Sequence, residues 1–451
     1  MPENYILLER TELNASAASV TFANIPQTGY TDLKIVASAR TTSSNTVEGS
    51  TITLNGSNTY SGRYLQGDGS SATSGSQSIV NTMLFTGATA TSNTFGNSEM
   101  YIPNYLGTTQ KSFSGDGVSE NNATQSFAGL FAGLATLTSA ITTITIAGNA
   151  SGSFVAGSTF SLYGIAAVGT TPVIAPKAYG GNRIDNDGTY WYHTFTSSGT
   201  FTPQTGLTAD VLVVAGGGGG SYYHGSGAGA GGLLTFTSQA LTSTTYNCTV
   251  GAGGSGTTAG SANTGSDSQF GALTLVKGGG GGQVYDVGNG VNGGSGSGAT
   301  SSSTNRTGGS PTSGQGFAGG DVTGGLTGFY PNAGGGGAGA VGGSITSGSQ
   351  AGGSGGIGLT NATLNAFGAA TTTGQLSSGN YYYAGGGGAG SFGGGGTGAG
   401  GLGGGGAGSA GTGTAGTVNT GGGGGAGGST NPANLGGAGG SGIIIVRYPI
   451  A

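Results

Sequence analysis

The chain has 451 residues, of which only 6% are charged, and its formal net charge is −5. Ten scattered basic residues form no basic patch, so nucleic-acid binding is not expected. No apolar run approaches the ~20 residues that span a bilayer, and the start of the chain lacks a basic segment followed by an apolar one, so neither membrane insertion nor a signal peptide is expected. The single cysteine, Cys248, excludes an internal disulfide, and its alternating, strand-like surroundings predict a buried thiol.

Residues 1–168 have the pattern of an all-β domain. Short runs rich in β-branched residues, separated by Ser, Gly and Asn clusters, predict strands at 33–37, 51–54, 141–146 and 160–165. Helical periodicity is almost absent, and the one stretch that could form a short helix, residues 127–137, contains two glycines that disfavour it. We predict a β-sandwich of the jelly-roll type.

Residues 169–188 read as a connector. Pro172 and Pro176 favour an extended chain, and residues 185–188 (Asp-Asn-Asp-Gly) predict a turn. A calcium loop would also use closely spaced aspartates, but no glutamate follows at the spacing such a loop requires. We therefore predict no metal site here.

From residue 189 onward, glycine dominates. Of the 109 glycines in the chain, 20 lie in residues 1–180 and 89 in residues 181–451. Strand-like runs bracket the glycine blocks, which argues against a flexible linker because a linker has no need of buried-type strands. The predicted strands are 190–195, 211–214, 233–236, 246–250, 273–276 and 443–448, and the blocks are 216–220, 278–282, 334–337, 385–388, 393–396, 403–406 and 421–425.

The glycine blocks either remain disordered or pack as extended helices of the polyglycine-II type. Such a helix has three residues per turn and no internal hydrogen bonds, so its amide groups are free to bond to neighbouring copies. Only glycine, with an alanine at the rim, allows backbones to approach that closely. We predict a glycine-rich β domain over residues 189–451, in which packed polyglycine-II-type helices are held at their ends by the strands.

Aromatic residues interrupt the glycine blocks within Gly, Ser and Asn loops. This composition is typical of recognition surfaces, because rigid rings supply contact area while small polar residues adapt their hydrogen bonds. The alternative is that the rings plug the framework, although three consecutive tyrosines at 381–383 are hard to bury together, so at least one is expected to be exposed. The candidate receptor-binding residues are Tyr222, Tyr223, His224, Tyr285, Phe329, Tyr330, Tyr381, Tyr382 and Tyr383, and Phe317 and Phe392 occupy similar loops.

Catalysis is not expected. After Gly216 the only acidic residues are Asp267, Asp286 and Asp321, which lie in separate loops and do not form the paired carboxylates of a glycosidase. The two histidines, His193 and His224, have no evident nucleophile beside them. We predict no enzyme activity and no cofactor.

Residues 189–451 resemble the glycine-rich domain of bacteriophage tail-fibre and related virion proteins. The resemblance rests on residues 195–201 (FTSSGTF), on the strand at 211–215 that runs into Gly216, on the repeated GGGGAG and NTGGGGG blocks, and on residues 440–448 (GSGIIIVRY). It implies that the loops at the far end of the glycine helices bind a host receptor. Residues 101–105 (YIPNY), 140–146 and 157–165 are similar to a β domain of virion structural proteins in tailed phages.

The resemblance implies a place on the virion surface, where the N-terminal domain docks to other virion proteins of the tail or capsid. The receptor would be a host-surface glycan or an outer-membrane protein. By analogy with phage fibres, a homotrimer is expected. A capsid decoration protein or head fibre without a dedicated receptor site is the alternative.

Overall fold

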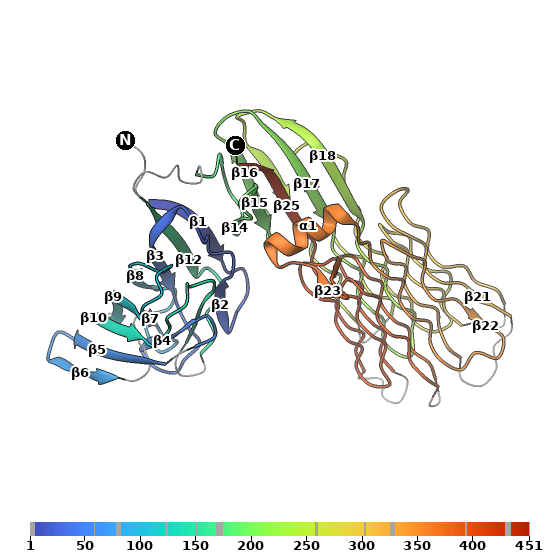
Figure 1. Cartoon of the computed structure of the whole chain (residues 1–451). Helices are drawn as coiled ribbons and strands as arrows, with labels where there is room; N and C mark the ends of the chain where they lie inside the picture. The colour runs from blue at the N-terminus through green and yellow to red at the C-terminus, as the bar shows by residue number, and fades with distance from the viewer. Residues whose placement is uncertain are drawn as a thin grey trace. The chain divides into compact units, whose positions relative to one another are not determined.

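The structure is a computed structural model of the chain (Figure 1). It describes residues 5–57, 59–77, 83–121, 125–148, 152–167, 175–257, 260–301, 304–324, 330–392, 395–428 and 434–450. Two compact units are present: an N-terminal unit of residues 1–177, 182–192 and 449–451, and a glycine-rich unit of residues 178–181 and 193–448. The all-β prediction is confirmed, and among the described residues no helix has the length and apolarity needed to cross a membrane.

The N-terminal unit holds two antiparallel sheets. Its larger sheet has the order β14-β1-β12-β3-β8-β9-β10-β5-β6, and its smaller sheet has the order β2-β11-β4-β7. The strands are β1 (Tyr5–Glu12), β2 (Ser19–Phe22), β3 (Tyr30–Ala39), β4 (Val47–Leu54), β5 (Tyr60–Gly67), β6 (Ala72–Gln77), β7 (Leu84–Thr86), β8 (Gly96–Ile102), β9 (Lys111–Asn121), β10 (Gln125–Ala135), β11 (Ile144–Gly148), β12 (Thr159–Ala166) and β14 (Arg183–Asn186).

One apolar core joins the two sheets. Phe22 and Ile146 of the smaller sheet are buried in the same cluster as Ile35 and Phe160 of the larger sheet. The strands alternate between buried and accessible residues, as in β4, where every second residue from Glu48 to Leu54 is buried. Two sheets that share their inward faces form a β-sandwich, and this is what the alternation predicted.

The short helix that the glycines disfavoured at 127–137 does not form, because residues 125–135 form strand β10, which pairs with β9 and β5 on its two sides. Two local predictions need correction. Asp185 lies in strand β14, and the turn comes after it, where the Asp187 carboxylate accepts the N–H groups of Thr189 and Tyr190 at 2.8 Å each. Residues 273–276 form no strand, and Val276 makes only an isolated bridge to Ser268.

The glycine-rich unit is built on a small framework of strands. These follow the orders β18-β17-β25-β15 and β13-β16-β19-β20. The elements are β13 (Ala178–Tyr179), β15 (Tyr190–Phe195), β16 (Gly199–Pro203), β17 (Leu207–Val214), β18 (Leu233–Leu241), β19 (Tyr246–Thr249), β20 (Gln269–Phe270), β21 (Val322–Thr323), β22 (Ile345–Thr346), helix α1 (Ala362–Thr371), β23 (Gln375–Ser377), β24 (Asn380–Tyr382) and β25 (Ile443–Pro449).

Helix α1 was not predicted from the sequence. The Asn361 side chain caps it by accepting the N–H of Leu364 at 2.9 Å, and Leu364 and Phe367 are fully buried. Its glycine and threonines are weak helix formers, so burial of one face stabilises the helix more than propensity does. Cys248, in β19, is buried as predicted.

The glycine blocks are ordered, and their hydrogen bonds repeat every three residues. In the block 216–220, each N–H donates to a carbonyl of another segment, and residues three apart turn to the same neighbour. Gly216 and Gly219 donate to Ser266 and Asn263, Gly217 and Gly220 donate to Gly440 and Gly437, and Gly218 donates to Gly229. A period of three with bonds only to neighbours is the pattern of polyglycine-II helices. We call this array of segments the glycine lattice.

Close packing explains the glycine requirement. A Cβ atom added to Gly335 would lie 1.9 Å from the carbonyl oxygen of Ala228, far inside van der Waals contact. The prediction that alanine is confined to the rim was wrong, since Ala228 and Ala230 are completely buried. The lattice therefore has interior positions where the neighbouring backbones leave room for one methyl group.

The lattice has two distinct ends (Figure 1). At the framework end, the segment after Val214 leaves β17, and the next segment returns to β18 at Leu233. Ser221 and Gly225 mark the opposite end, which we call the tip. Gly427 donates to Ser221, and Gly390 donates to Gly225, so the segments that contain these glycines reach the same tip.

Candidate functional site

Six aromatic rings meet at the tip. The His224 ring lies at the centre, with its centroid 4.7 Å from Tyr223, 4.6 Å from Tyr285 and 5.5 Å from Phe392. Tyr330 is 5.6 Å from Tyr285, and Tyr222 is 6.1 Å from Tyr223. These six residues, the tip cluster, come from four segments that are far apart in the sequence. The lattice therefore brings together five of the predicted residues and adds Phe392.

The backbone at the tip is held in unusual conformations. Tyr223, His224, Asp286 and Tyr330 have φ angles of 49°, 41°, 58° and 39°, in the left-handed region that non-glycine residues rarely adopt. Each such residue costs of order 1–3 kcal/mol and persists only where the surroundings enforce it. Strain of this kind gathers at functional sites, which makes the tip a candidate site.

Hydrogen bonds from a neighbouring segment hold the histidine loop. The Asn332 side chain donates to the carbonyl of His224, and its Oδ1 accepts the N–H of Ser301 at 2.6 Å. Asn332 is fully buried, and its own N–H donates to Gly390, just before Phe392. Through its side chain and its backbone N–H, Asn332 thus links its own segment, which carries Tyr330, to those of His224 and Phe392.

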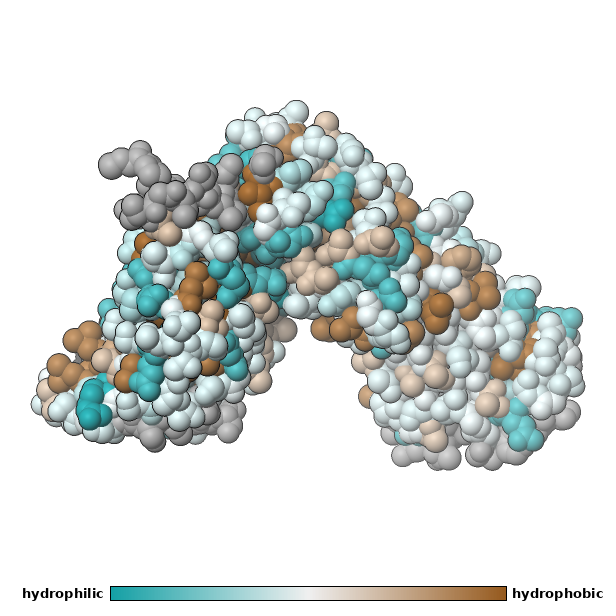
Figure 2. All heavy atoms as spheres, in the orientation of Figure 1, coloured by the Kyte–Doolittle hydropathy of each residue, from teal (hydrophilic) through white to brown (hydrophobic). Residues whose placement is uncertain are grey.

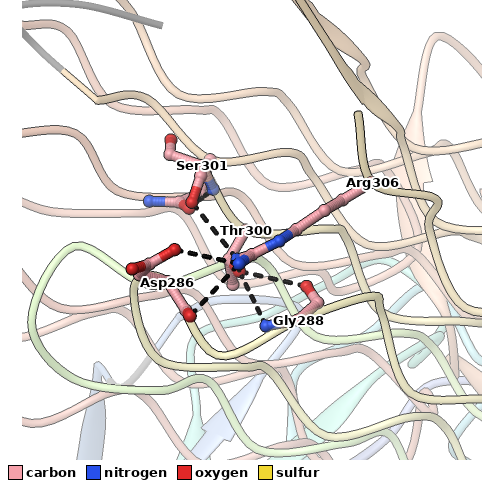
Figure 3. Close-up of polar contacts among 6 residues, drawn as sticks. Asp286, Gly288, Thr300, Ser301 and Arg306 are labelled. Atoms are coloured by element: carbon pink, nitrogen blue, oxygen red, sulfur yellow. Dashed lines mark hydrogen bonds and ion pairs between the residues drawn. The ribbon is translucent and has the colours of Figure 1, made fainter. Parts of the chain in front are cut away.

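Arg306 fixes the adjacent loop (Figure 3). Its Nη2 donates to the Asp286 carboxylate at 2.9 Å and to the Asp286 carbonyl at 3.2 Å, and its Nη1 donates to Thr300 Oγ1 at 2.7 Å. Thr300 Oγ1 also donates to the carbonyl of Gly288 at 3.0 Å. The Arg306 guanidinium is mostly buried while Asp286 is exposed. The ion pair therefore holds the loop after Tyr285 in place, and its two opposite charges compensate one another.

The centre of the cluster is neutral and its rim is exposed. His224 is 2% exposed, and burial lowers its pKa to about 4, against the opposing effect of the backbone carbonyls of Tyr330 and of His224 itself. Its Nδ1 is buried and has no hydrogen-bond partner among the described residues. Tyr223 and Phe392 are 37% and 41% exposed and are the most accessible rings of the cluster, whereas Tyr222, Tyr285 and Tyr330 are half-buried.

Charge is scarce around the tip. Residues 216–440 contain five charged residues, which are Asp267, Lys277, Asp286, Arg306 and Asp321. The first four form two ion pairs, at 2.6 Å between Lys277 and Asp267 and at 2.9 Å between Arg306 and Asp286. The tip thus presents ring faces, hydroxyls and backbone amides to a ligand.

The predicted tyrosines at 381–383 lie away from the tip cluster. They precede the segment that starts at Ala384, whose N–H donates to Thr420 at the framework end. Tyr383 is completely buried and its hydroxyl bonds to Thr373 Oγ1 at 2.7 Å, whereas Tyr381 and Tyr382 in β24 are half-buried. Phe329 lies outside the described residues.

Three ionisable side chains, Glu9, Arg183 and Asp185, form a mostly buried cluster in the N-terminal unit. Arg183 in β14 donates to Glu9 at 3.0 Å and to Asp185 at 2.8 Å. Burial raises the pKa of Glu9 to about 8 and that of Asp185 to about 6, so the pair tends to retain a proton near neutral pH. Glu9 is 3% exposed and Asp185 is fully buried, which leaves these carboxylates no access to a substrate. They fasten β14 to β1.

No metal centre is built from the described part of the chain, where no three His, Cys, Asp or Glu side chains come together. His193 is also structural, with Nδ1 2.6 Å from the Gly180 carbonyl and Nε2 2.9 Å from the Tyr448 hydroxyl. The tip cluster is therefore the candidate functional site of the glycine-rich unit.

Comparison with protein families supports treating the framework and the lattice as one domain. Residues 195–449 match the model of the glycine-rich domain family. The chain belongs to this family. The matched region of the glycine-rich domain begins in β15 and ends with β25, so it includes the framework strands as well as the glycine blocks. No curated protein matches the chain.

Proposed function

We propose that the chain is a bacteriophage virion protein of the tail-fibre or fibre-tip type, and that its tip cluster binds a receptor on the host surface. The observation that supports this most is the convergence of six aromatic residues from four distant segments at the lattice end opposite the framework strands. The N-terminal unit then docks the chain to other virion proteins.

The lattice suits such a role because it pre-organises the rings. Its segments are cross-linked by backbone hydrogen bonds to several neighbours, so the loops start from fixed ends. Rings that are already placed lose little conformational freedom when a ligand binds, and this loss is a main cost of recognition by loops. A flexible linker would supply no such platform.

The receptor is proposed to be a glycan with neutral sugars. A folded protein surface carries about 25% charged residues, and burying those charges against a tip that has few charges to pair with them is costly. A neutral sugar presents C–H groups to ring faces and hydroxyls to tyrosine hydroxyls and backbone amides. Binding, not catalysis, is proposed, because the carboxylate beside the tip cluster, Asp286, is held in an ion pair with Arg306 at 2.9 Å.

A matched pair of variants tests the proposal. Phe392 at the tip and Phe317, near the framework end of its segment, are 41% and 43% exposed within the same lattice. Fluorescently labelled full-length Phe392→Ala should lose at least about tenfold in affinity for host cells, which corresponds to ~1.4 kcal/mol. Phe317→Ala should bind as the unsubstituted chain does. Equal binding by both variants would reject the tip as the contact.

The exposed rings favour an adhesin over a capsid decoration protein, which needs none. Imaging of intact particles labelled on this chain separates the two positions. Label at the end of the tail supports the proposal, whereas label over the capsid facets supports the decoration protein.

A further inference from the structure

We propose that the outward face of β5, β8, β9 and β10 in the N-terminal unit is a docking groove for an extended segment of another virion protein, with a lysine or arginine between apolar residues. This face belongs to a different unit from the tip cluster, so the inference does not depend on the identity of the receptor. It specifies the chemistry through which the N-terminal unit would attach.

A groove lies on this outward face. Its volume is about 620 Å³, and its lining includes the aliphatic Leu65, Val118 and Leu130 and the carboxylates Glu99 and Asp116. Leu65 is 52% exposed and Leu130 is 58% exposed, although both lie in the middle of their strands. Figure 2 shows the corresponding hydrophobic surface over this end of the N-terminal unit. Adjoining exposed leucines of this kind mark interaction sites more often than isolated ones do.

The strand register lines these residues up in one row. Leu65 pairs with Leu130, Leu130 pairs with Asp116, and Asp116 pairs with Glu99. Directly paired residues on neighbouring strands project from the same face of a sheet. The row therefore runs from two leucines to two carboxylates across the four strands. A bound partner would contact apolar surface on β5 and β10 and negative charge on β9 and β8.

The two carboxylates of the row differ in their pairing. Lys34 forms an ion pair with Glu99 at 2.7 Å, whereas Asp116 takes part in no ion pair among the described residues. Burial and the charge of Glu99 raise the pKa of Asp116, against the opposing charge of Lys34. Like charges placed opposite one another across a strand pair destabilise a sheet. A basic group bound in the groove would pair with Asp116 and offset the repulsion between Asp116 and Glu99.

The same chemistry argues against other occupants. A second copy would bring Lys34 and Arg63 together with its own Glu99 and Asp116, so it would present no net positive charge to Asp116. An anionic membrane surface would place further negative charge beside Asp116. A partner segment with one basic residue matches the unpaired carboxylate of Asp116, and its aliphatic neighbours match the leucines.

The test uses the full chain and two synthetic peptides that differ at one position. The acetylated and amidated probe Leu-Thr-Val-Lys-Val-Thr-Leu-Ser is compared with the same peptide carrying Glu in place of Lys, by fluorescence anisotropy at low salt. We expect the Lys peptide to bind at least about tenfold more tightly than the Glu peptide. Asp116→Asn should remove this preference, and Leu130→Ser should weaken both peptides.

Phe317→Ala, in the glycine-rich unit and outside the tip cluster, is the control and should change neither peptide's binding. Equal binding of the two peptides, no binding of either, or a preference that survives in Asp116→Asn would overturn the proposal. Sedimentation of the unsubstituted chain and of Leu130→Arg addresses the remaining occupant. An oligomer lost only in Leu130→Arg would assign the face to a second copy and would also overturn it. None of these outcomes bears on cell binding by the tip.

Discussion

Replacing a single lattice glycine by alanine should destabilise the glycine-rich unit strongly. In Gly335→Ala, the added Cβ would lie 1.9 Å from the Ala228 carbonyl oxygen and 2.3 Å from its carbonyl carbon. Ordinary contact requires about 3.2 Å or more, so one segment must move by more than 1 Å, roughly a third of the length of a hydrogen bond.

The cost follows from the hydrogen bonds that such a shift would break. Gly335 donates to Gly387 at 2.9 Å, Gly387 donates to Ala228 at 2.8 Å, and Gly356 donates to Gly335 at 2.9 Å. Each buried donor or acceptor left unpaired costs about 1–3 kcal/mol. Alanine offsets this loss by about 0.5–1 kcal/mol, because it restricts the unfolded chain more than glycine does. Two unpaired groups, each near the middle of the range of about 1–3 kcal/mol, therefore give a net destabilisation of about 2–4 kcal/mol.

Thermal unfolding followed by calorimetry measures this effect. For a unit of this size, 2–4 kcal/mol lowers Tm by roughly 5–15 °C. Gly206→Ala is the matched control, because its nearest neighbour would lie 3.9 Å from the new Cβ and its φ is not in the left-handed region. A Gly335→Ala protein as stable as Gly206→Ala would refute the close-packed lattice.

Three further variants probe other parts of the chain. Burial raises the pKa of Glu9 from 4.5 to about 8, so the stability that its protonated form contributes is complete below pH ~4.5 and is lost as the pH rises through 8. Glu9→Gln should flatten this decline in a pH series of Tm values. An unchanged slope would count against the buried network of Glu9, Arg183 and Asp185. Arg306→Met removes the ion pair with Asp286, so the loop after Tyr285 should be cleaved faster in limited proteolysis and the variant should bind cells several-fold more weakly. Cleavage at the wild-type rate would argue against the role of Arg306 in holding this loop. Tyr383→Phe removes the bond to Thr373 and should cost about 1 kcal/mol in chemical unfolding while leaving cell binding intact, whereas weaker binding would extend the site to the framework end.

The framework strands were predictable because the residue types within each run are enough to indicate a buried strand. The runs at 211–214 and 443–448 are β-branched and apolar, and they form the adjacent strands β17 and β25. Helix α1 was not predictable in the same way, since a glycine, an asparagine and two threonines offset its alanines and it is stabilised by burying Phe367, which also lies against Arg447 at 4.9 Å. Its stability depends on contacts that sequence spacing does not reveal.

The tip cluster was only partly predicted, because loop composition alone does not show at which lattice end an aromatic residue lies. Tyr383 and Phe392 flank one outgoing segment, residues 384–390, which spans about 20 Å at ~3.1 Å per residue. Tyr383 precedes it and lies at the framework end, whereas Phe392 follows it and lies at the tip. Counting segments outward from Val214 would have supplied this information: Tyr285 follows an outgoing block, and Tyr330 precedes a returning one.

Order in the glycine blocks is the claim on which the tip depends, and amide hydrogen exchange of the full chain tests it most directly. Peptides that cover residues 216–220 and 421–428 should exchange as slowly as those of strands β17 and β25, because their N–H groups donate within the lattice. Complete exchange of these glycine amides within seconds, beside protected framework strands, would contradict the lattice and remove the platform that holds the six rings together.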